Sequence, residues 1–347
     1  MILYIASRET DYLQDLTFAG LADVLGPESL AVFPPHWQYR RERRFPWTRK
    51  LAYPENLGSL SENVPAGGGS LSRVRKALAG GDFRAAVLGS AKPDALESFL
   101  RIEEDLNVPW IFVDGGDWRE IGGDFKRLGG EGCFRRFQGL LKRRPPSAVF
   151  KRELPPAAAE DGVFPLPFSV NSRLVPRLPV RSLKTARVLF RAVESSEIRR
   201  KVFRILAGRY DCQANGSVPG RKYRGYELRG EPYFRALNGT RIALSFRGEG
   251  FDTLRYWEIP ACGSLLVSEA PDIVIPDNFE DGASAVFCRP DASDLLEILD
   301  RYLSREEEAA RIAEKGQELL FARHTHARRA EYLLEILEKR AGIRLVR

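Results

Sequence analysis

The sequence predicts an α/β protein of two domains, each built on a parallel sheet with helices on both faces. At roughly 100–200 residues per domain, 347 residues suggest about two domains. Short apolar runs alternate with helical patterns in both halves of the chain, which is typical of strand–helix–strand units. A proline-rich stretch, residues 143–179, separates the halves and is expected to resist helix and sheet alike.

The composition is that of a folded globular protein. Hydrophobic residues make up 44% and charged residues 29%, which excludes the disordered, collagen-like and small disulfide-rich classes. No apolar run approaches the roughly 18 residues of a membrane-spanning helix. Residues 1–7 lack a basic region before their apolar run, so we interpret them as a buried strand and not a signal peptide.

Cysteine, histidine and net charge restrict the chemistry. The four cysteines are far apart and form no Cys-x-x-Cys pair: Cys133, Cys212, Cys262 and Cys288. We therefore expect neither disulfides nor a zinc site, and we predict a cytoplasmic location. Only three histidines are present, which leaves few metal ligands or catalytic triads. The net charge of +7 favours an anionic partner, whether phosphate, nucleic acid or a membrane surface.

The first half supplies four predicted strands and one clear helix. The strands are residues 2–6, 29–33, 85–89 and 110–113, and the helix is residues 93–107. The glycine-rich residues 64–70 are interpreted as a loop. They follow no apolar run and lack the glycine spacing of a nucleotide-binding fingerprint.

The second half repeats this alternation. Its predicted strands are residues 187–190, 242–246, 265–268 and 285–287. Ser195 or Ser196 is expected to cap a helix after the first of them, and further helices are predicted at residues 253–259, 291–303 and 326–340. Ser304 and Glu307 have the spacing of a capping box that opens another helix. The whole predicts two Rossmann-like domains joined by a proline-rich hinge.

The segment after residue 242 has the pattern of an anion site. A buried strand runs into Gly248 and Gly250 and then into a helix that starts near Thr253. Glycines let a backbone approach a ligand closely, and the first N–H groups of a helix are unsatisfied donors. Together with the helix dipole they suit a diphosphate.

Charged side chains surround this turn. Arg247 lies just before it, and Arg255 could neutralise the same diphosphate. Glu258 follows Arg255 by about one helical turn and could accept hydrogen bonds from ribose hydroxyls. The pattern alone is equally compatible with a tight turn beside a solvated Arg–Glu pair.

Three stretches of the second half resemble a known family. They read GEGFDTLRYWEIPACGSLLVSE, AVFCRPDASDLLEILDRYLS and ARHTHARRAEYLLEIL. In this order they are similar to the C-terminal domain of GT-B glycosyltransferases, closest to the CgeB-like, spore-maturation type of group 1, with fainter similarity to exostosin-like domains. The resemblance covers about residues 238–338.

The resemblance implies a GT-B architecture and a transfer reaction. An N-terminal acceptor domain would span residues 1–170 and a donor domain residues 171–325, with residues 326–347 forming a helix that packs back toward the first domain. The activity implied is transfer of a sugar from a nucleotide-diphosphate donor, most naturally a UDP-sugar, to a glycan of the cell envelope, a lipid-linked acceptor or a protein.

The resemblance also implies roles for individual donor-site residues. Glu258 matches the glutamate near the donor ribose, and Arg255 matches the family's arginine. Thr253 and Leu254 match the helix start beside the diphosphate. Arg199 or Arg200 would supply a second phosphate-neutralising charge.

The acceptor side is predicted from the strand ends of the first domain, where open α/β sheets bind ligands. Asp114 and Asp117, in the sequence VDGGDW, are the candidate general bases for an inverting transfer, and His36 is the alternative. Asp114 could equally begin an Asx turn before two glycines, and His36 could be a packed loop residue.

No metal and no cofactor beyond the nucleotide-sugar substrate is expected, because the chain has no Asp-x-Asp motif and must stabilise the leaving diphosphate with arginines and helix starts. The basic residues 39–50 and 142–152 are either solvated loops or contacts for an anionic acceptor or the inner membrane face. No nucleic-acid recognition motif is present. The alternatives left open are a nucleotide-sugar 2-epimerase of the same fold and a non-catalytic binder of an anionic polymer.

Overall fold

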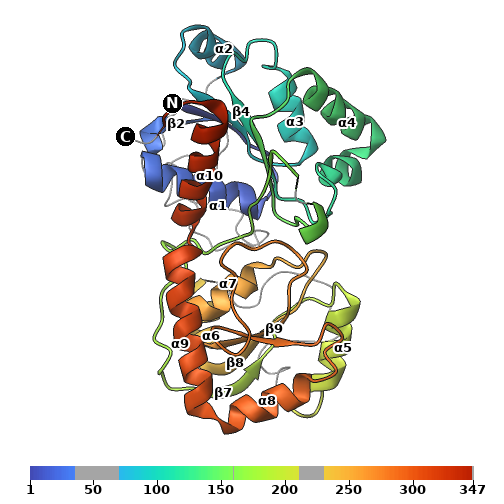
Figure 1. The fold of residues 1–347 in the computed structure, drawn as a ribbon, viewed down its shortest axis with the longest axis vertical. Coiled ribbons are helices and arrows are strands. Elements are labelled where there is room, and N and C mark those ends of the chain that lie inside the picture. Colours follow the sequence, from blue (N-terminus) through green and yellow to red (C-terminus); the bar gives the residue numbers. More distant parts are fainter. Residues whose placement is uncertain (36–69, 159, 211–229, 346–347) are drawn as a thin grey trace. The chain divides into compact units, whose positions relative to one another are not determined.

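The computed structural model describes residues 1–35, 70–158, 160–210 and 230–345. The chain divides into two compact units (Figure 1). The first unit comprises Met1–Phe168 and His326–Arg347, and the second comprises Ser169–Thr325. The domain boundaries predicted from the sequence lie after residues 170 and 325.

The first unit contains, within its described residues, a six-stranded sheet in which every neighbouring pair is parallel. Its order is β2-β1-β3-β4-β5-β6. The direction of the strand order reverses between β1 and β3, and a crevice at the carboxyl ends is expected at such a reversal. The strands are β1 (Ile2–Ile5), β2 (Leu30–Phe33), β3 (Ala85–Leu88), β4 (Trp110–Asp114), β5 (Ala148–Lys151) and β6 (Val163–Pro165).

Strands β5 and β6 correct one expectation. Both lie in the proline-rich stretch 143–179, which was predicted to exclude strands. The prolines are placed where they interrupt no ladder: Pro145 and Pro146 precede β5, and Pro165 ends β6 at the edge of the sheet. An edge strand tolerates the missing N–H group of proline.

Helices cover this sheet, and one of them is shorter than the sequence predicts. They are α1 (Tyr12–Leu25), α2 (Leu71–Ala79), α3 (Pro93–Leu100), α4 (Gly123–Arg143) and α10 (His326–Ala341). The helix predicted for residues 93–107 ends at Leu100 and continues as turns. Ile102 and Leu106 are nevertheless buried. The pattern of apolar residues therefore continues beyond the end of the helix.

Helix α10 packs along α1, as Figure 1 shows, and thereby joins the end of the chain to its beginning. Nε2 of the buried His326 lies 2.8 Å from Oδ2 of Asp23. Gly20 of α1 provides the close approach, since a Cβ there would lie 2.2 Å from the carbonyl oxygen of His326. The helix pair therefore depends on a small residue at one contact point.

The second unit contains a parallel sheet with the order β10-β9-β8-β7. Its strands are β7 (Ala186–Leu189), β8 (Thr240–Ser245), β9 (Leu265–Glu269) and β10 (Val286–Cys288). Its helices are α5 (Glu197–Leu206), α6 (Gly230–Asn238), α7 (Leu254–Ala261), α8 (Leu295–Ser304) and α9 (Glu306–Arg323). Ser196 caps α5, as the sequence predicts, by accepting from the backbone N of Arg199 at 3.4 Å.

The capping box predicted at Ser304 and Glu307 is wrong. Helix α9 begins at Glu306, and its N-cap residue is Arg305, which makes no capping hydrogen bond through its side chain. The Ser304 hydroxyl instead donates to the carbonyl oxygen of Arg301 at 2.8 Å. Ser304 therefore ends α8 and does not cap α9. The acidic residues in the first turn of α9 stabilise that helix through its dipole.

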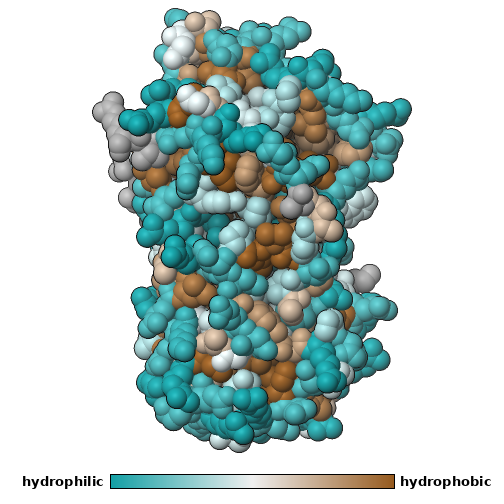
Figure 2. Space-filling model, in the orientation of Figure 1, coloured by the Kyte–Doolittle hydropathy of each residue, from teal (hydrophilic) through white to brown (hydrophobic). Residues whose placement is uncertain are grey.

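Each sheet has its own hydrophobic core of aliphatic and aromatic residues. The face of the molecule in Figure 2 is largely hydrophilic, with apolar residues in smaller areas. No helix in the described part of the chain is long and apolar enough to cross a membrane.

Candidate functional site

The predicted donor residues lie in the second unit, around the carboxyl ends of β7 and β8. Strand β8 ends at Ser245, and a turn containing Gly248 and Gly250 leads to α7, whose first residue is Leu254. Loops at the carboxyl ends of parallel strands are where open α/β sheets bind ligands. This turn and the first turn of α7 form the candidate donor site.

Arg199 is buried against this turn. Its Nε and Nη2 donate to the carbonyl oxygen of Phe246 at 3.0 and 2.9 Å, and its Nη1 donates to that of Val193 at 3.2 Å. These contacts fix the turns after β7 and β8 relative to each other. Arg200, the next residue, is exposed and is the better placed of the two for the predicted phosphate contact.

Arg247 is held by contacts that the sequence does not reveal. Its carbonyl oxygen accepts from Ser196 Oγ at 2.8 Å, and its backbone N donates to Glu269 Oε1 at 2.8 Å. Its guanidinium pairs with Glu269 and lies 4.8 Å from the ring centre of Phe251. Burial raises the pKa of Glu269, and Arg247 partly offsets this. Glu269 was not predicted from the sequence, although its position at the end of β9, the strand beside β8, was the available signal.

A backbone hydrogen bond closes the glycine turn, and the Thr253 side chain contacts Ser245 at the end of β8. The backbone N of Gly248 donates to the carbonyl oxygen of Gly250 at 3.1 Å. Thr253 Oγ1 lies 2.9 Å from Ser245 Oγ and makes no capping hydrogen bond to α7. The Thr253 side chain therefore does not cap α7 and leaves the first amide groups of the helix available to an anion.

Arg255 and Glu258 lie one turn apart on α7, and Tyr233 of α6 completes the group. The Tyr233 hydroxyl donates to Glu258 Oε2 at 2.8 Å, and Glu258 is 8% exposed. Burial raises the pKa of Glu258, while Tyr233 and Arg255 partly offset that rise. Nε and Nη1 of Arg255 are buried and have no hydrogen-bond partner in the part of the chain that the structure describes. Tyr233 was not predicted from the sequence, because its contact with Glu258 depends on the packing of α6 on α7.

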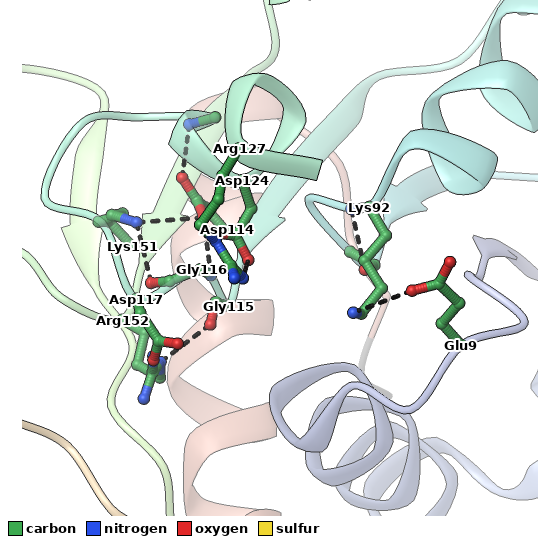
Figure 3. Close-up of polar contacts among 12 residues, drawn as sticks. Glu9, Lys92, Asp114, Gly115, Gly116, Asp117, Asp124, Arg127, Lys151 and Arg152 are labelled. Carbon is green, nitrogen blue, oxygen red and sulfur yellow. Dashed lines mark hydrogen bonds and ion pairs between the residues drawn. The ribbon is translucent and has the colours of Figure 1, made fainter. Parts of the chain in front are cut away.

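Asp114 is part of a buried ion pair in the first unit (Figure 3). Its Oδ1 lies 3.1 Å from Lys151 Nζ, and both side chains are 0% exposed. It also accepts from the backbone N of Gly116 at 3.0 Å and from that of Gly122 at 2.6 Å. These contacts favour the Asx-turn interpretation and leave Asp114 no route to an acceptor hydroxyl, so it is a poor general base.

Asp117 is 32% exposed and is the better placed of the two predicted aspartates. It pairs with Arg152, which lies at the carboxyl end of β5. Arg152 also donates through Nε to the carbonyl oxygen of Gly115 at 2.9 Å (Figure 3). Its guanidinium carbon lies 4.5 Å from the ring centre of Phe168. Arg152 therefore holds both the loop after β4 and the carboxylate that this loop presents.

Asp11, which was not predicted from the sequence, is a further carboxyl group at this edge of the sheet. It caps α1 by accepting from the backbone N of Gln14 at 3.2 Å, and it accepts from Ser90 Oγ, after β3, at 2.6 Å. Burial raises its pKa, and the hydrogen bonds from Ser90 and Gln14 partly offset that rise. It lies where the strand order reverses, between the loops that follow β1 and β3.

Two predicted features cannot be compared with the structure. His36, the alternative base, and the basic residues 39–50 lie outside the described residues. The structure brings no three His, Cys, Asp or Glu side chains together as metal ligands within the ranges that it describes.

Residues 181–335 match the family model described as "Glycosyl transferase-like". The matched segment contains the whole Arg255–Glu258–Tyr233 group and every other predicted donor residue. A search of curated proteins finds no match to the chain.

Solved structures share the fold over nearly the whole chain. Anabaena HepE in complex with UDP-glucose is 12% identical, with a TM-score of 0.59 over 97% of this chain and 99% of that one. A glycosyltransferase from Rickettsia africae is 10% identical, with a TM-score of 0.58 over 98% of both chains. Sucrose-phosphate synthase from Thermosynechococcus elongatus is 12% identical, with a TM-score of 0.55 over 97% and 98%. The chain therefore has the GT-B fold, and its second unit is similar to glycosyl transferases.

Proposed function

We propose that this protein is a glycosyltransferase that moves a sugar from a UDP-sugar to a hydroxyl group of a glycan, lipid-linked or protein acceptor. The Arg255–Glu258–Tyr233 group carries the proposal, because it puts unused N–H donors and a buried carboxylate together at the start of α7. The segment that contains the group matches the glycosyl transferase-like family. HepE, which shares the fold, was solved with UDP-glucose and with UDP, which supports a uridine nucleotide.

The donor would bind through the second unit. A transferase must stabilise the negative charge that develops on the leaving diphosphate. Arg255, Arg200 and the first amides of α7 would supply that stabilisation, with Arg247 held beside the glycine turn by Glu269. Glu258 would accept hydrogen bonds from the ribose. A metal-free mechanism remains part of the proposal, because the sequence lacks an Asp-x-Asp motif.

The acceptor would be activated by a carboxylate of the first unit. In an inverting transfer, the acceptor oxygen attacks the anomeric carbon, its proton passes to the carboxylate, and the bond to the diphosphate breaks. Asp117 is the first described candidate, because its side chain is 32% exposed. Asp11 is the second, although both of its carboxylate oxygens accept hydrogen bonds, whereas Asp114 is fully buried.

The cellular setting belongs to the proposal as well. A positively charged chain, at +7, suits an anionic acceptor or contact with the inner membrane face of a cytoplasmic protein. Membership of the CgeB-like subfamily is retained as a further expectation from the three stretches of sequence that resemble it.

The test is release of nucleoside diphosphate from a panel of UDP-, GDP-, TDP- and ADP-sugars, with and without EDTA. Acceptors are water, n-octyl β-D-glucoside and a bacterial lipid extract. We expect turnover of a UDP-sugar that EDTA leaves unchanged and that Glu258→Gln lowers by about 10²-fold. Release from none of the donors would reject the transferase, and loss with EDTA would reject the metal-free mechanism alone.

A further inference from the structure

The Tyr233–Glu258 hydrogen bond joins two helices at the candidate donor site. Tyr233 lies on α6 and Glu258 on α7, and the hydroxyl donates to Oε2 at 2.8 Å. Glu258 is nearly buried, so few alternative partners are available to it. A single bond of this kind fixes the rotation of the carboxyl group about its last side-chain torsion, which is otherwise broad.

The other oxygen of this carboxyl group is unused. Among the described residues, no side chain or backbone group donates a hydrogen bond to Glu258 Oε1. An ionised carboxylate has about four acceptor positions, and Tyr233 fills only one of them. Oε1 is not among the buried atoms that lack a partner in the described part of the chain, so it is open to a ligand.

Arg255 supplies the complementary unused groups. Its Nε and Nη1 are buried and have no hydrogen-bond partner within the described ranges. It lies three residues before Glu258 on the same helix, close enough to influence that carboxyl group electrostatically. A nucleotide can satisfy both residues, because its ribose carries hydroxyl donors for the carboxylate and its phosphates carry anionic oxygens for the guanidinium.

We infer that Tyr233 is a positioning residue that holds Glu258 with Oε1 facing the ribose hydroxyls of the bound nucleotide. This inference rests on the proposed function and deepens it, because it assigns a nucleotide-recognition role to a residue of α6. Tyr233 itself does not touch the ribose in this arrangement and acts through the carboxyl group of Glu258.

A ligand without the ribose diol separates this role from a structural one. Calorimetric titrations compare UDP with 2′,3′-dideoxy-UDP on the parent and on Tyr233→Phe, which removes only the hydroxyl. We expect the affinity for UDP to fall about tenfold, a typical effect of one hydrogen bond to a charged group, and that for dideoxy-UDP to stay within about twofold. Glu258→Gln should show the same selectivity.

Tyr256→Phe is the matched control. Tyr256 is also on α7, and its hydroxyl donates to Asn278 Oδ1 at 2.8 Å, away from Glu258. We expect it to change the affinity for the two ligands equally, if at all. Thermal unfolding of each variant verifies that it is folded before titration.

Two results would overturn the inference while leaving the proposed function intact. These are an unchanged UDP affinity in Tyr233→Phe, and an equal loss for UDP and dideoxy-UDP. If the parent prefers another nucleoside diphosphate, that nucleotide and its dideoxy form replace the UDP pair. A parent that binds none of them rejects the proposed function, and the inference falls with it.

Discussion

Burial and neighbouring charge act in opposite directions on Glu258. Removal from water raises the pKa of its carboxyl group above the ordinary value of 4.5, and Tyr233 and Arg255 partly offset that rise. A folded-state pKa above the unfolded one means that the folded protein binds more protons between the two values. Its stability therefore falls as the pH rises through that window.

Glu258→Gln removes the titrating carboxyl group and keeps the side chain at nearly the same size. We expect the free energy of unfolding of the variant, relative to the parent, to increase as the pH rises upward from about 4.5, because only the parent must ionise a buried carboxyl group. Urea unfolding at several pH values measures the difference. Glu249→Gln, at an exposed position before α7, is the control and should change stability by no more than about 0.5 kcal/mol. A difference for Glu258→Gln that does not vary with pH contradicts the account.

Asp114→Asn should destabilise the first unit strongly. The substitution leaves Lys151 as an unpaired charge in a fully buried position, which typically lowers stability by about 3–5 kcal/mol. Asp117→Asn removes a partly exposed pair and should cost about 1 kcal/mol, since Arg152 keeps its contacts with Glu153 and Gly115. Urea unfolding compares the two variants, and equal effects would show that Asp114 is not the anchor of this loop.

Residue types and spacing could single out a candidate donor segment but not the partners of its side chains. The glycine turn and the Arg255–Glu258 spacing were visible in the sequence. The hydrogen bonds from Arg199 to the carbonyl oxygen of Phe246 were not visible in the sequence, because the two residues lie 47 positions apart, after different strands. Asp114 and Lys151 are likewise brought together only by the pairing of β4 with β5.

At the scale of elements, the contact between α1 and α10 depends on Gly20. Gly20→Ala would place a Cβ 2.2 Å from the carbonyl oxygen of His326 and 2.9 Å from the Cβ of Ala330. Because a backbone atom cannot yield cheaply, we expect a loss of about 1–3 kcal/mol by thermal or urea unfolding. Release of α10 should also make the C-terminal segment more sensitive to limited proteolysis.

Gly132→Ala is the matched control for this prediction. Gly132 lies within α4, and a Cβ there would meet no atom within 4 Å. We expect a stabilisation of up to about 1 kcal/mol, since alanine is favoured over glycine in a helix. If Gly20→Ala is equally harmless, the close packing of α1 on α10 is not as described.

The strands were easier to predict than the helices for a physical reason. Strands of a parallel sheet are buried on both faces and appear as short apolar runs, so β1, β2, β3 and β4 stood out. Helix α1 has no polar face, since ten of its fourteen residues are buried, and so shows no helical period. Helix α4 is interrupted by glycines and kinked at Gly130, which weakens its sequence signal.

At the scale of the whole molecule, the two proposed tasks fall on two different sheets. The second unit contains the group proposed to recognise the nucleotide, and the edge of the first unit contains the carboxylates proposed to activate an acceptor. The C-terminal helix α10 belongs to the first unit, so the chain passes through the second unit and returns. Fold class was predictable from the alternation of strands and helices, whereas the route of the last helix came from the family resemblance.

The proposed function requires a nucleoside-diphosphate site in the second unit, built on α7. The most direct test is a calorimetric titration of UDP, GDP, TDP and ADP into the parent, Arg255→Ala and Arg235→Ala. Arg235 is an exposed arginine of α6 paired with Glu231 and serves as the control. The account predicts that the parent and Arg235→Ala bind UDP alike, and that Arg255→Ala binds it at least about tenfold more weakly. Binding of none of the four by the parent, or equal UDP binding by the parent and Arg255→Ala, would contradict it.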